Sequence, residues 1–225
     1  MGIMSLILEI IYPNKCGFCG AGISKDKLIC HECAGKLRLD YYIGKPKDIP
    51  GEKPIELLMY AGIYSGHARR GVLRLKDSPA ANVIKYLSIT LIDKIKEKGL
   101  DGKIDYIAFV PMSRGRESKR GFNQAELIAK HIAGELSKPI LYDAICKRGR
   151  LLSQHKLKSY RQRQLHAGSS YYLKRGAKRI DGYTVLLCDD VITSGSTLAS
   201  CSELLKELGA KRIFAFTLLS SRNHR

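Results

Sequence analysis

The sequence predicts an α/β fold, a parallel sheet flanked by helices, with a small cysteine-rich module in front of it. Two observations lead to this prediction: strand patterns alternate with helical periodicity from Leu57 onward, and four of the seven cysteines lie within the first 45 residues. The segment between these parts carries three prolines, which is typical of a linker. We therefore expect an N-terminal helix and cysteine module at 1–45, a linker at 46–56 and an α/β domain at 57–225.

In the first half of the domain, the sequence pattern predicts a strand, two helices and a second strand. A strand and its turn begin at Leu57, and a short basic helix is expected at 66–76. Apolar residues at helical spacing predict a helix over 79–98 that ends at Gly99. The nearly continuous apolar run 104–111 is of the kind buried in parallel sheets.

The second half of the domain begins with a basic segment, 112–122, which we expect to be a loop. Asn123 is the expected N-cap of the helix that follows, with Glu126 as its capping-box partner. In the last third of the chain, the sequence pattern predicts strand 184–188, loop 189–197, a helix to Leu208 capped by Gly209, and strand 213–219.

Charge is the unusual bulk property of the chain. Its 225 residues hold 39 Lys and Arg against 21 Asp and Glu, a net charge of +18. Eleven of the positive residues fall within 144–180, where there is no acidic residue. Such a balance favours an anionic partner: nucleic acid, a phosphorylated metabolite or an acidic membrane surface. The alternative is a lysine-rich, solvated surface.

The apolar stretch Ile3–Tyr12 is short, contains Glu9 and ends at Pro13. These features predict a short amphipathic helix rather than a signal peptide or a membrane span. We therefore expect no transmembrane segment and a cytoplasmic protein, in which the cysteines are reduced thiols.

The segment Thr184–Thr197, TVLLCDDVITSGST, joins a buried strand to the first turn of a helix. Gly195 and its small neighbours allow the backbone to fold closely around an anion, and the free N–H groups of a helix start attract one. Asp189 and Asp190 would repel phosphate but can accept hydrogen bonds from sugar hydroxyls. The GxxxxGK[ST] pattern of nucleoside triphosphatases is absent. We expect this segment to bind a phosphorylated ribose; the alternative is an ordinary capped helix.

Four cysteines have the spacing C-x2-C-x10-C-x2-C: Cys16, Cys19, Cys30 and Cys33. Two such knuckles place four thiolates at the corners of a tetrahedron, which Zn²⁺ favours, and a four-cysteine site has no open position for catalysis. We therefore predict structural zinc. His31 is an alternative ligand, and two disulfides or free thiols are the alternatives to a metal.

The sequence VLLCDDVITSGST resembles the phosphoribosyl pyrophosphate signature of type I phosphoribosyltransferases. The resemblance implies that the two aspartates hold the ribose hydroxyls, that Thr193 to Thr197 hold the 5′-phosphate, and that Mg²⁺ accompanies the ligand. The implied binding residues are Asp189, Asp190, Val191, Ile192, Thr193, Ser194, Gly195, Ser196 and Thr197. In this fold the loop after strand 104–111 contacts pyrophosphate, and here it offers Ser113, Arg114 and Arg116.

The sequence VP…RGFNQAELIAKHIA resembles the ComF family, whose members join a cysteine-rich zinc finger to a phosphoribosyltransferase-like domain. The resemblance extends to Tyr64, Gly66, Arg69, Leu75, Lys76, Arg148, Gln154, Arg161 and Arg163. The chain departs from the family pattern at His166, where an Asn is usual, and at Tyr171, where a Phe is usual. The resemblance implies handling of single-stranded DNA in natural transformation, together with DNA-uptake proteins.

The basic segments are physically suited to that role. Lys and Arg neutralise backbone phosphates, and Phe122, Tyr160, Tyr171 and Tyr172 lie among them as stacking platforms. The candidate nucleic-acid or substrate residues are Lys119, Arg120, Phe122, Arg148, Gln154, Arg161 and Arg163. The alternative is that 144–180 is a mobile catalytic loop whose charges steer a polyphosphate substrate.

Three functions remain open at this point. The first is a protein of DNA uptake that binds phosphoribosyl pyrophosphate and single-stranded DNA. The second is a genuine phosphoribosyltransferase acting on an unidentified base or nucleophile with release of pyrophosphate, and the third is a structural zinc adaptor that assembles an uptake machine. The cysteine module stands where a base-binding segment would be expected, which favours the first function over the second.

Overall fold

The computed structural model describes residues 14–47, 49, 54–76, 81–148 and 170–224 of the chain. The predicted helix over 3–12 lies outside the described residues. So do several residues of the basic segment to which a role was assigned: Gln154, Tyr160, Arg161, Arg163 and His166.

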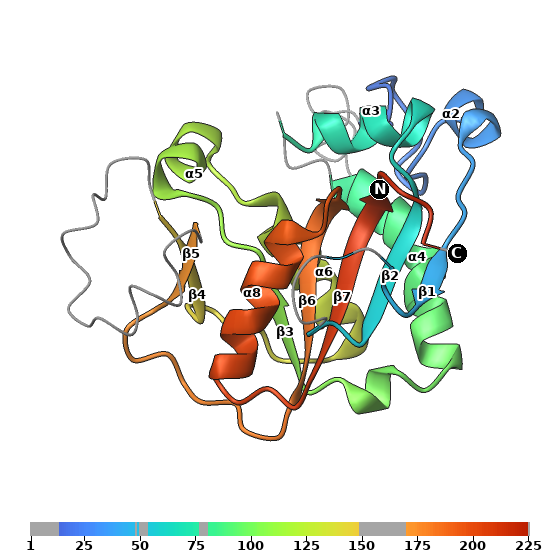
Figure 1. Ribbon diagram of the computed structural model, residues 1–225. Helices are drawn as coiled ribbons and strands as arrows, with labels where there is room; N and C mark the ends of the chain where they lie inside the picture. The colour runs from blue at the N-terminus through green and yellow to red at the C-terminus, as the bar shows by residue number, and fades with distance from the viewer. Residues whose placement is uncertain (1–13, 48, 50–53, 77–80, 149–169, 225) are drawn as a thin grey trace, which may run out of the picture.

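A five-stranded sheet forms the centre of the molecule, in the order β1–β2–β7–β6–β3 (Figure 1). The strands are β1 (Tyr42–Gly44), β2 (Leu57–Ile63), β3 (Tyr106–Phe109), β6 (Thr184–Ile192) and β7 (Arg212–Ser220). Strands β2, β7, β6 and β3 are parallel, and β1 pairs antiparallel with β2 at one edge. The predicted α/β fold is confirmed.

Helices cover both faces of this sheet. α4 (Ala81–Glu97) and α6 (Gln124–Leu136) lie behind it in Figure 1, and α8 (Ser196–Glu207) lies in front. Side chains of β6 alternate between the two cores: Leu186 belongs to the cluster with α4 and α6, whereas Leu187 belongs to the cluster with α8. Burial on both faces explains why the strand has a continuous apolar sequence.

The remaining elements are short. They are α2 (His31–Lys36), α3 (Gly66–Arg74), η1 (Asp101–Lys103), α5 (Arg114–Arg120) and the antiparallel hairpin of β4 (Ile145–Lys147) and β5 (Tyr171–Leu173). The hairpin lies beside α5 at one side of the molecule (Figure 1). Among the described residues, no helix has the length and apolar character needed to cross a bilayer.

The predicted loop at 112–122 was wrong, because Arg114–Arg120 forms α5. This helix has no apolar face, so periodicity gives no sign of it, but Gly121 adopts the left-handed conformation (φ 80°) that ends many helices. Asn123 is confirmed as the N-cap of α6, since its side chain accepts a hydrogen bond from the Ala125 N–H at 3.0 Å. The capping box was wrong: Glu126 pairs instead with Lys130 Nζ at 2.7 Å.

Strand β6 is longer than the predicted strand 184–188, and it places both aspartates inside the sheet. Pairing with β7 continues from Thr184 to Ile192, because β7 is equally long. The connection to α8 is therefore only Thr193–Gly195, and Gly195 is the N-cap of that helix in the left-handed conformation.

The division into 1–45, 46–56 and 57–225 stays a prediction, and the structure shows contacts across it. β1 extends the main sheet. Ile49 and Ile55, within the expected linker, are buried in the core under α8.

Candidate functional site

A cavity of about 270 Å³ lies where β3 and β6 end, at the carboxyl edge of the parallel strands. Open α/β sheets bind their ligands at this edge. We call it the edge cavity, and it is lined by Lys76, Val110, Pro111, Met112, Arg116, Arg120, Asn123, Gln124, Ala125, Lys147, Tyr171, Asp189, Asp190, Val191 and Thr197.

Two adjacent carboxylates line one part of the edge cavity. The Asp190 N–H donates to Asp189 Oδ1 at 2.8 Å, and the Val191 N–H donates to Asp190 Oδ1 at 2.7 Å. Burial, together with the neighbouring charge of Asp190, raises the pKa of Asp189 well above its ordinary value. The raised pKa means that ionising Asp189 beside Asp190 is unfavourable. A ligand that donates hydrogen bonds or brings a cation would stabilise the two charged carboxylates.

The loop Thr193–Gly195 presents its backbone at the start of α8. The N–H groups of Thr193, Ser194 and Gly195 have no acceptor among the described residues. Ser194 Oγ and Ser196 Oγ lie 2.9 Å apart, and Thr197 lines the edge cavity. A Cβ on Gly195 would come within 3.0 Å of Ile49 Cγ1 and would have to adopt φ 79°, so the position requires glycine. The loop thus keeps its amide donors open for an anion.

The RGFNQ motif holds the cavity wall together. Asn123 Nδ2 donates to the Val110 carbonyl at 3.1 Å, which fixes the chain after β3. Gln124 Nε2 donates to the Leu75 carbonyl at 3.0 Å, and Gln124 Oε1 accepts from Arg120 at 3.2 Å. The motif therefore ties the end of α3, the end of α5 and the start of α6 to one another.

Four cations from three parts of the fold line the edge cavity together with the two carboxylates. Lys76 follows α3, Arg116 and Arg120 lie on α5, and Lys147 ends β4, where its Nζ donates to Tyr171 Oη at 2.8 Å. Carboxylates suit hydroxyl groups and cations suit phosphates. The arrangement therefore fits a sugar that carries phosphoryl groups.

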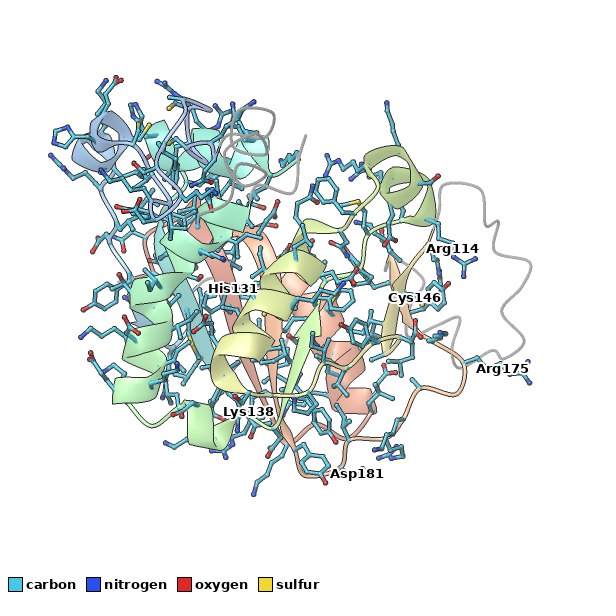
Figure 2. All side chains as sticks on the ribbon, turned by 180° about the vertical axis from the view of Figure 1, so that it is seen from behind. Arg114, His131, Lys138, Cys146, Arg175 and Asp181 are labelled. Carbon is cyan, nitrogen blue, oxygen red and sulfur yellow. The ribbon has the colours of Figure 1, made fainter. Side chains whose placement is uncertain are left out.

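Two further hollows adjoin the edge cavity. The cation cleft, of about 500 Å³, is lined by Lys76, Arg116, Lys119 and Arg120. The tyrosine cavity, of about 260 Å³, lies between α5 and the hairpin and holds Arg114, Tyr142, Cys146 and Tyr172 among its lining residues. Figure 2, seen from behind, labels Arg114 and Cys146 on this side of the molecule.

The predicted site residues fall into distinct places. Asp189, Asp190, Val191, Thr197, Arg116 and Arg120 line the edge cavity, Lys119 lines the cation cleft, and Arg114 lines the tyrosine cavity. The Ile192 side chain is buried in the core. Other predicted residues line none of the three hollows: Ser113, Phe122, Thr193, Ser194, Gly195 and Ser196. The Arg148 guanidinium lies 5.9 Å from the Tyr172 ring centroid.

Sequence reasoning missed the site roles of Lys76, Gln124 and Lys147. Lys76 and Gln124 stood inside motifs that carried the family resemblance, and Lys147 opens the basic segment. Their places in one cavity depend on how α3, α6 and the hairpin meet, which no local pattern records.

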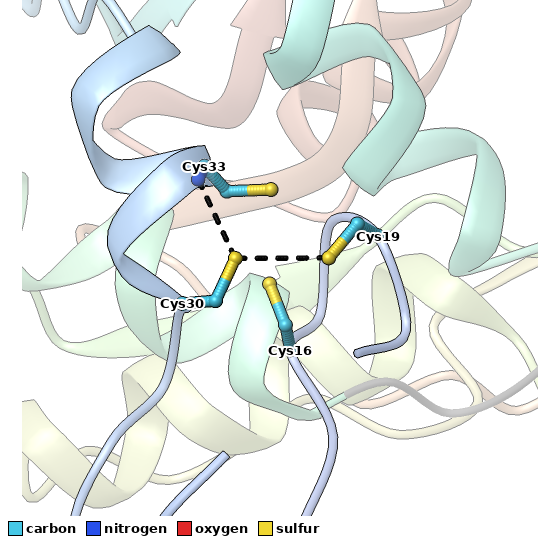
Figure 3. A group of neighbouring side chains, drawn as sticks. All are labelled: Cys16, Cys19, Cys30 and Cys33. Atoms are coloured by element: carbon cyan, nitrogen blue, oxygen red, sulfur yellow. Dashed lines mark hydrogen bonds between the residues drawn. The ribbon is translucent and has the colours of Figure 1, made fainter. Parts of the chain in front are cut away.

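The four predicted metal ligands come together in the cysteine module, residues 14–45 (Figure 3). All four sulfur atoms lie within 4.8 Å of one another, and Cys19 Sγ is 3.7 Å from Cys30 Sγ. A tetrahedron with Zn–S bonds of about 2.3 Å has edges of about 3.8 Å, so the cluster fits zinc. The cysteines are free of disulfides, and His31 is outside the cluster.

Backbone amides favour the thiolate form of Cys16, whereas burial raises the pKa of Cys33. Burial raises the pKa of the Cys16 thiol, but hydrogen bonds from the backbone of Cys30, Cys19 and Phe18 outweigh it, and the pKa falls to about 6. The Cys33 N–H also lies 3.4 Å from Cys30 Sγ. Sulfur atoms arranged in this way are suited to hold a cation.

The cysteine module is packed directly on α3 and α4. A Cβ on Gly71 would lie 2.5 Å from Phe18, and a Cβ on Gly17 would lie 2.5 Å from Val83, so both glycines allow close approach. The Phe18 ring meets the Tyr86 ring edge-on at 5.6 Å. The module is therefore a fixed part of the fold.

Comparison with known families and proteins gives two matched domains. Residues 7–45 match a double zinc ribbon domain, and residues 121–225 match a phosphoribosyl transferase domain. The DNA utilization protein YhgH of Escherichia coli (strain K12) is 25% identical over 206 residues, which cover 90% of this chain and 88% of YhgH.

Two competence proteins match shorter stretches. Competence protein F of Haemophilus influenzae is 33% identical over 104 residues, 46% of this chain and 45% of that protein. Competence protein ComFC of Bacillus subtilis is 30% identical over 113 residues, 50% of this chain and 43% of that protein. Among solved structures, adenine phosphoribosyltransferase from Saccharomyces cerevisiae is 21% identical, with a TM-score of 0.44, over 85% of this chain and 90% of that chain. The predicted combination of a zinc module with a phosphoribosyltransferase-type domain is confirmed.

Proposed function

We propose that this ComF-family chain binds phosphoribosyl pyrophosphate with Mg²⁺, binds single-stranded DNA, and acts in DNA uptake. The observation that carries the proposal is the edge cavity, which brings two carboxylates, the start of α8 and four cations together. The names of the relatives, competence protein and DNA utilization protein, support a role in handling DNA.

In this proposal the sugar lies with its hydroxyls on Asp189 and Asp190 and its 5′-phosphate against the open amides of Thr193–Gly195. The pyrophosphate then faces Lys76, Arg116 and Arg120. A Mg²⁺ that accompanies the ligand would neutralise phosphate charge, and the carboxylates available to it here are the two aspartates.

Calorimetric titration with phosphoribosyl pyrophosphate and Mg²⁺ tests this assignment. The double variant Asp189→Asn, Asp190→Asn keeps the shape of both side chains and removes both charges, and we expect at least a tenfold weaker affinity. Asp93→Asn on the exposed surface of α4 is the matched control and should bind as the wild type does. Equal affinity in the double variant and the wild type would contradict the assignment.

The DNA part of the proposal rests on charge. Binding that relies on Lys and Arg contacts to phosphates releases counterions, so its affinity falls steeply as salt rises. We expect a labelled single strand to bind at low KCl, by fluorescence anisotropy, and to dissociate as KCl rises. A flat salt response, or no binding at low salt, would contradict it.

We place this activity in the cytoplasm, with DNA-uptake proteins as partners. The cluster of free thiols supports this location, because such sites persist where thiols are kept reduced.

A genuine phosphoribosyltransferase is the second candidate, and the tyrosine cavity favours it. This hollow shares Pro111, Met112 and Lys147 with the edge cavity, and Tyr142 and Tyr172 could face a planar base. In that reaction a base nitrogen forms a bond to C1 of the sugar while the C1–O bond to pyrophosphate breaks and its electron pair leaves with pyrophosphate. Release of pyrophosphate that depends on an added base would establish this function, and its absence with every common nucleobase would leave the binding function.

A further inference from the structure

The cation cleft differs from the other hollows described here because all four of the described side chains that line it are positive. Lys76, Arg116 and Arg120 also line the edge cavity, whereas Lys119 lines only the cleft. The two spaces therefore adjoin each other, and three cations line both.

Acidic side chains of the described residues do not neutralise these charges. Within the described part of the chain, no ion pair joins Lys76, Arg116, Lys119 or Arg120 to an acidic group, and the hydrogen bond from Arg120 goes to the neutral amide of Gln124. Glu117, on the same helix, lines the tyrosine cavity instead. Like charges held close together repel one another, and an anion relieves that repulsion.

The lining of the cleft indicates which anion it takes. Among the described residues its lining has no aromatic or hydroxyl side chain, and its four cationic side chains are suited to phosphates. A pyrophosphate group is already accommodated by the cations of the edge cavity, which leaves Lys119 and the further volume of the cleft in excess. Arg116 and Lys119 are exposed, so a chain of phosphates can enter and leave.

We propose that the cation cleft is a backbone site for single-stranded nucleic acid, and that a strand and phosphoribosyl pyrophosphate compete for Lys76, Arg116 and Arg120. This inference rests on the proposed function, which supplies both ligands. It adds that each ligand lowers the affinity for the other, because a cation engaged by one phosphate is not available to the next.

Three single variants separate the two sites. Lys119→Ala should weaken strand binding about three- to tenfold, reduce the slope of log affinity against log salt by about 1, and leave phosphoribosyl pyrophosphate binding unchanged. Thr197 lines the edge cavity but not the cation cleft, so Thr197→Val should weaken the binding of phosphoribosyl pyrophosphate and leave strand binding unchanged. Arg116→Ala should weaken the binding of both ligands. Lys85→Ala, an exposed lysine of α4, is the charge-matched control and should change neither.

Competition is measured with a labelled single strand titrated in the presence of Mg²⁺ and increasing phosphoribosyl pyrophosphate. We expect the apparent Kd of the strand to rise with phosphoribosyl pyrophosphate, and to rise in the same way with inorganic pyrophosphate. Simultaneous binding of both ligands with unchanged affinities would overturn the inference while leaving the proposed function intact. Loss of either binding event in the wild type would instead overturn the proposed function as well.

Inorganic tripolyphosphate serves as the third probe. If it bound in a manner dependent on Lys119 while the strand did not, the cleft would be a site for free polyphosphate and the inference would be overturned.

Discussion

The cysteine module and the edge cavity meet at the end of α3, and their polar groups are satisfied very differently. In the module, the Asn14 side chain bonds to the Ser24 and Lys27 carbonyls, and the Asn82 side chain bonds back to Asn14. In the edge cavity two carboxylates stand side by side, and at the start of α8 the N–H groups of Thr193–Gly195 have no acceptor among the described residues. The polar groups of the module are hydrogen-bonded within the protein, whereas those of the edge cavity are available to a ligand.

This contrast shows which region maintains the fold and which performs the function. Satisfied polar groups and close packing stabilise the native state, whereas adjacent like charges destabilise it until a ligand arrives. Substitutions in the module should therefore lower stability, and substitutions among the cavity carboxylates should raise it.

The largest effect should come from the metal cluster. Cys16→Ser removes one of four ligands and should lower the free energy of unfolding by more than about 4 kcal/mol, because metal binding and folding of such a module are linked. Denaturant unfolding and metal analysis check this, with Cys146→Ser outside the cluster as the control. An unchanged midpoint together with no bound zinc in the wild type would show that the cluster holds no structural metal.

The contact between α3 and the module should come next. Gly71→Ala drives a Cβ to 2.5 Å from the buried Phe18 ring, and such overpacking costs about 1–3 kcal/mol. Gly134→Ala is the matched control, because that helical glycine has open space around it and alanine there should stabilise α6 by about 0.5–1 kcal/mol. If both variants shifted the unfolding midpoint in the same direction, the module would not be seated as described.

The third prediction concerns Gln124, whose hydrogen bonds join the end of α3 to α5 at the edge cavity. Gln124→Ala leaves the Leu75 carbonyl without its side-chain donor, which should cost about 1–2 kcal/mol of stability. Because Lys76 follows that carbonyl, the variant should also weaken phosphoribosyl pyrophosphate binding in the titration. Weakened stability with unchanged affinity would mean that Lys76 is positioned by other contacts.

The smallest effect has the opposite sign. Asp189→Asn removes a charge that burial and Asp190 disfavour, and should stabilise the protein by about 1 kcal/mol, or roughly 2–4 °C in Tm. The folded-state pKa of Asp189 is raised, so this group costs nothing below its unfolded pKa of about 4 and destabilises the wild type as pH rises through the folded value. The gain in Tm should therefore be largest at neutral pH and vanish near pH 4; a loss at neutral pH would contradict the assignment of strain to this pair.

Local patterns predicted the features that are local in the fold. The aspartate pair, the capping by Asn123 and the cysteine spacing each lie within a short segment, and the sequence revealed all three. The extension of β6 to Ile192 was missed because pairing with β7 imposes it. The cation cleft was missed because Lys76 and α5 are distant in sequence, and Gln124 links them by bonding to the Leu75 carbonyl and to Arg120.

The most direct measurement is a crystal structure of the protein with phosphoribosyl pyrophosphate and Mg²⁺. We expect density in the edge cavity, with the 5′-phosphate against Thr193–Gly195 and Thr197 and the ribose hydroxyls on Asp189 and Asp190. A ligand bound elsewhere, or an empty cavity at a saturating ligand concentration, would contradict this expectation.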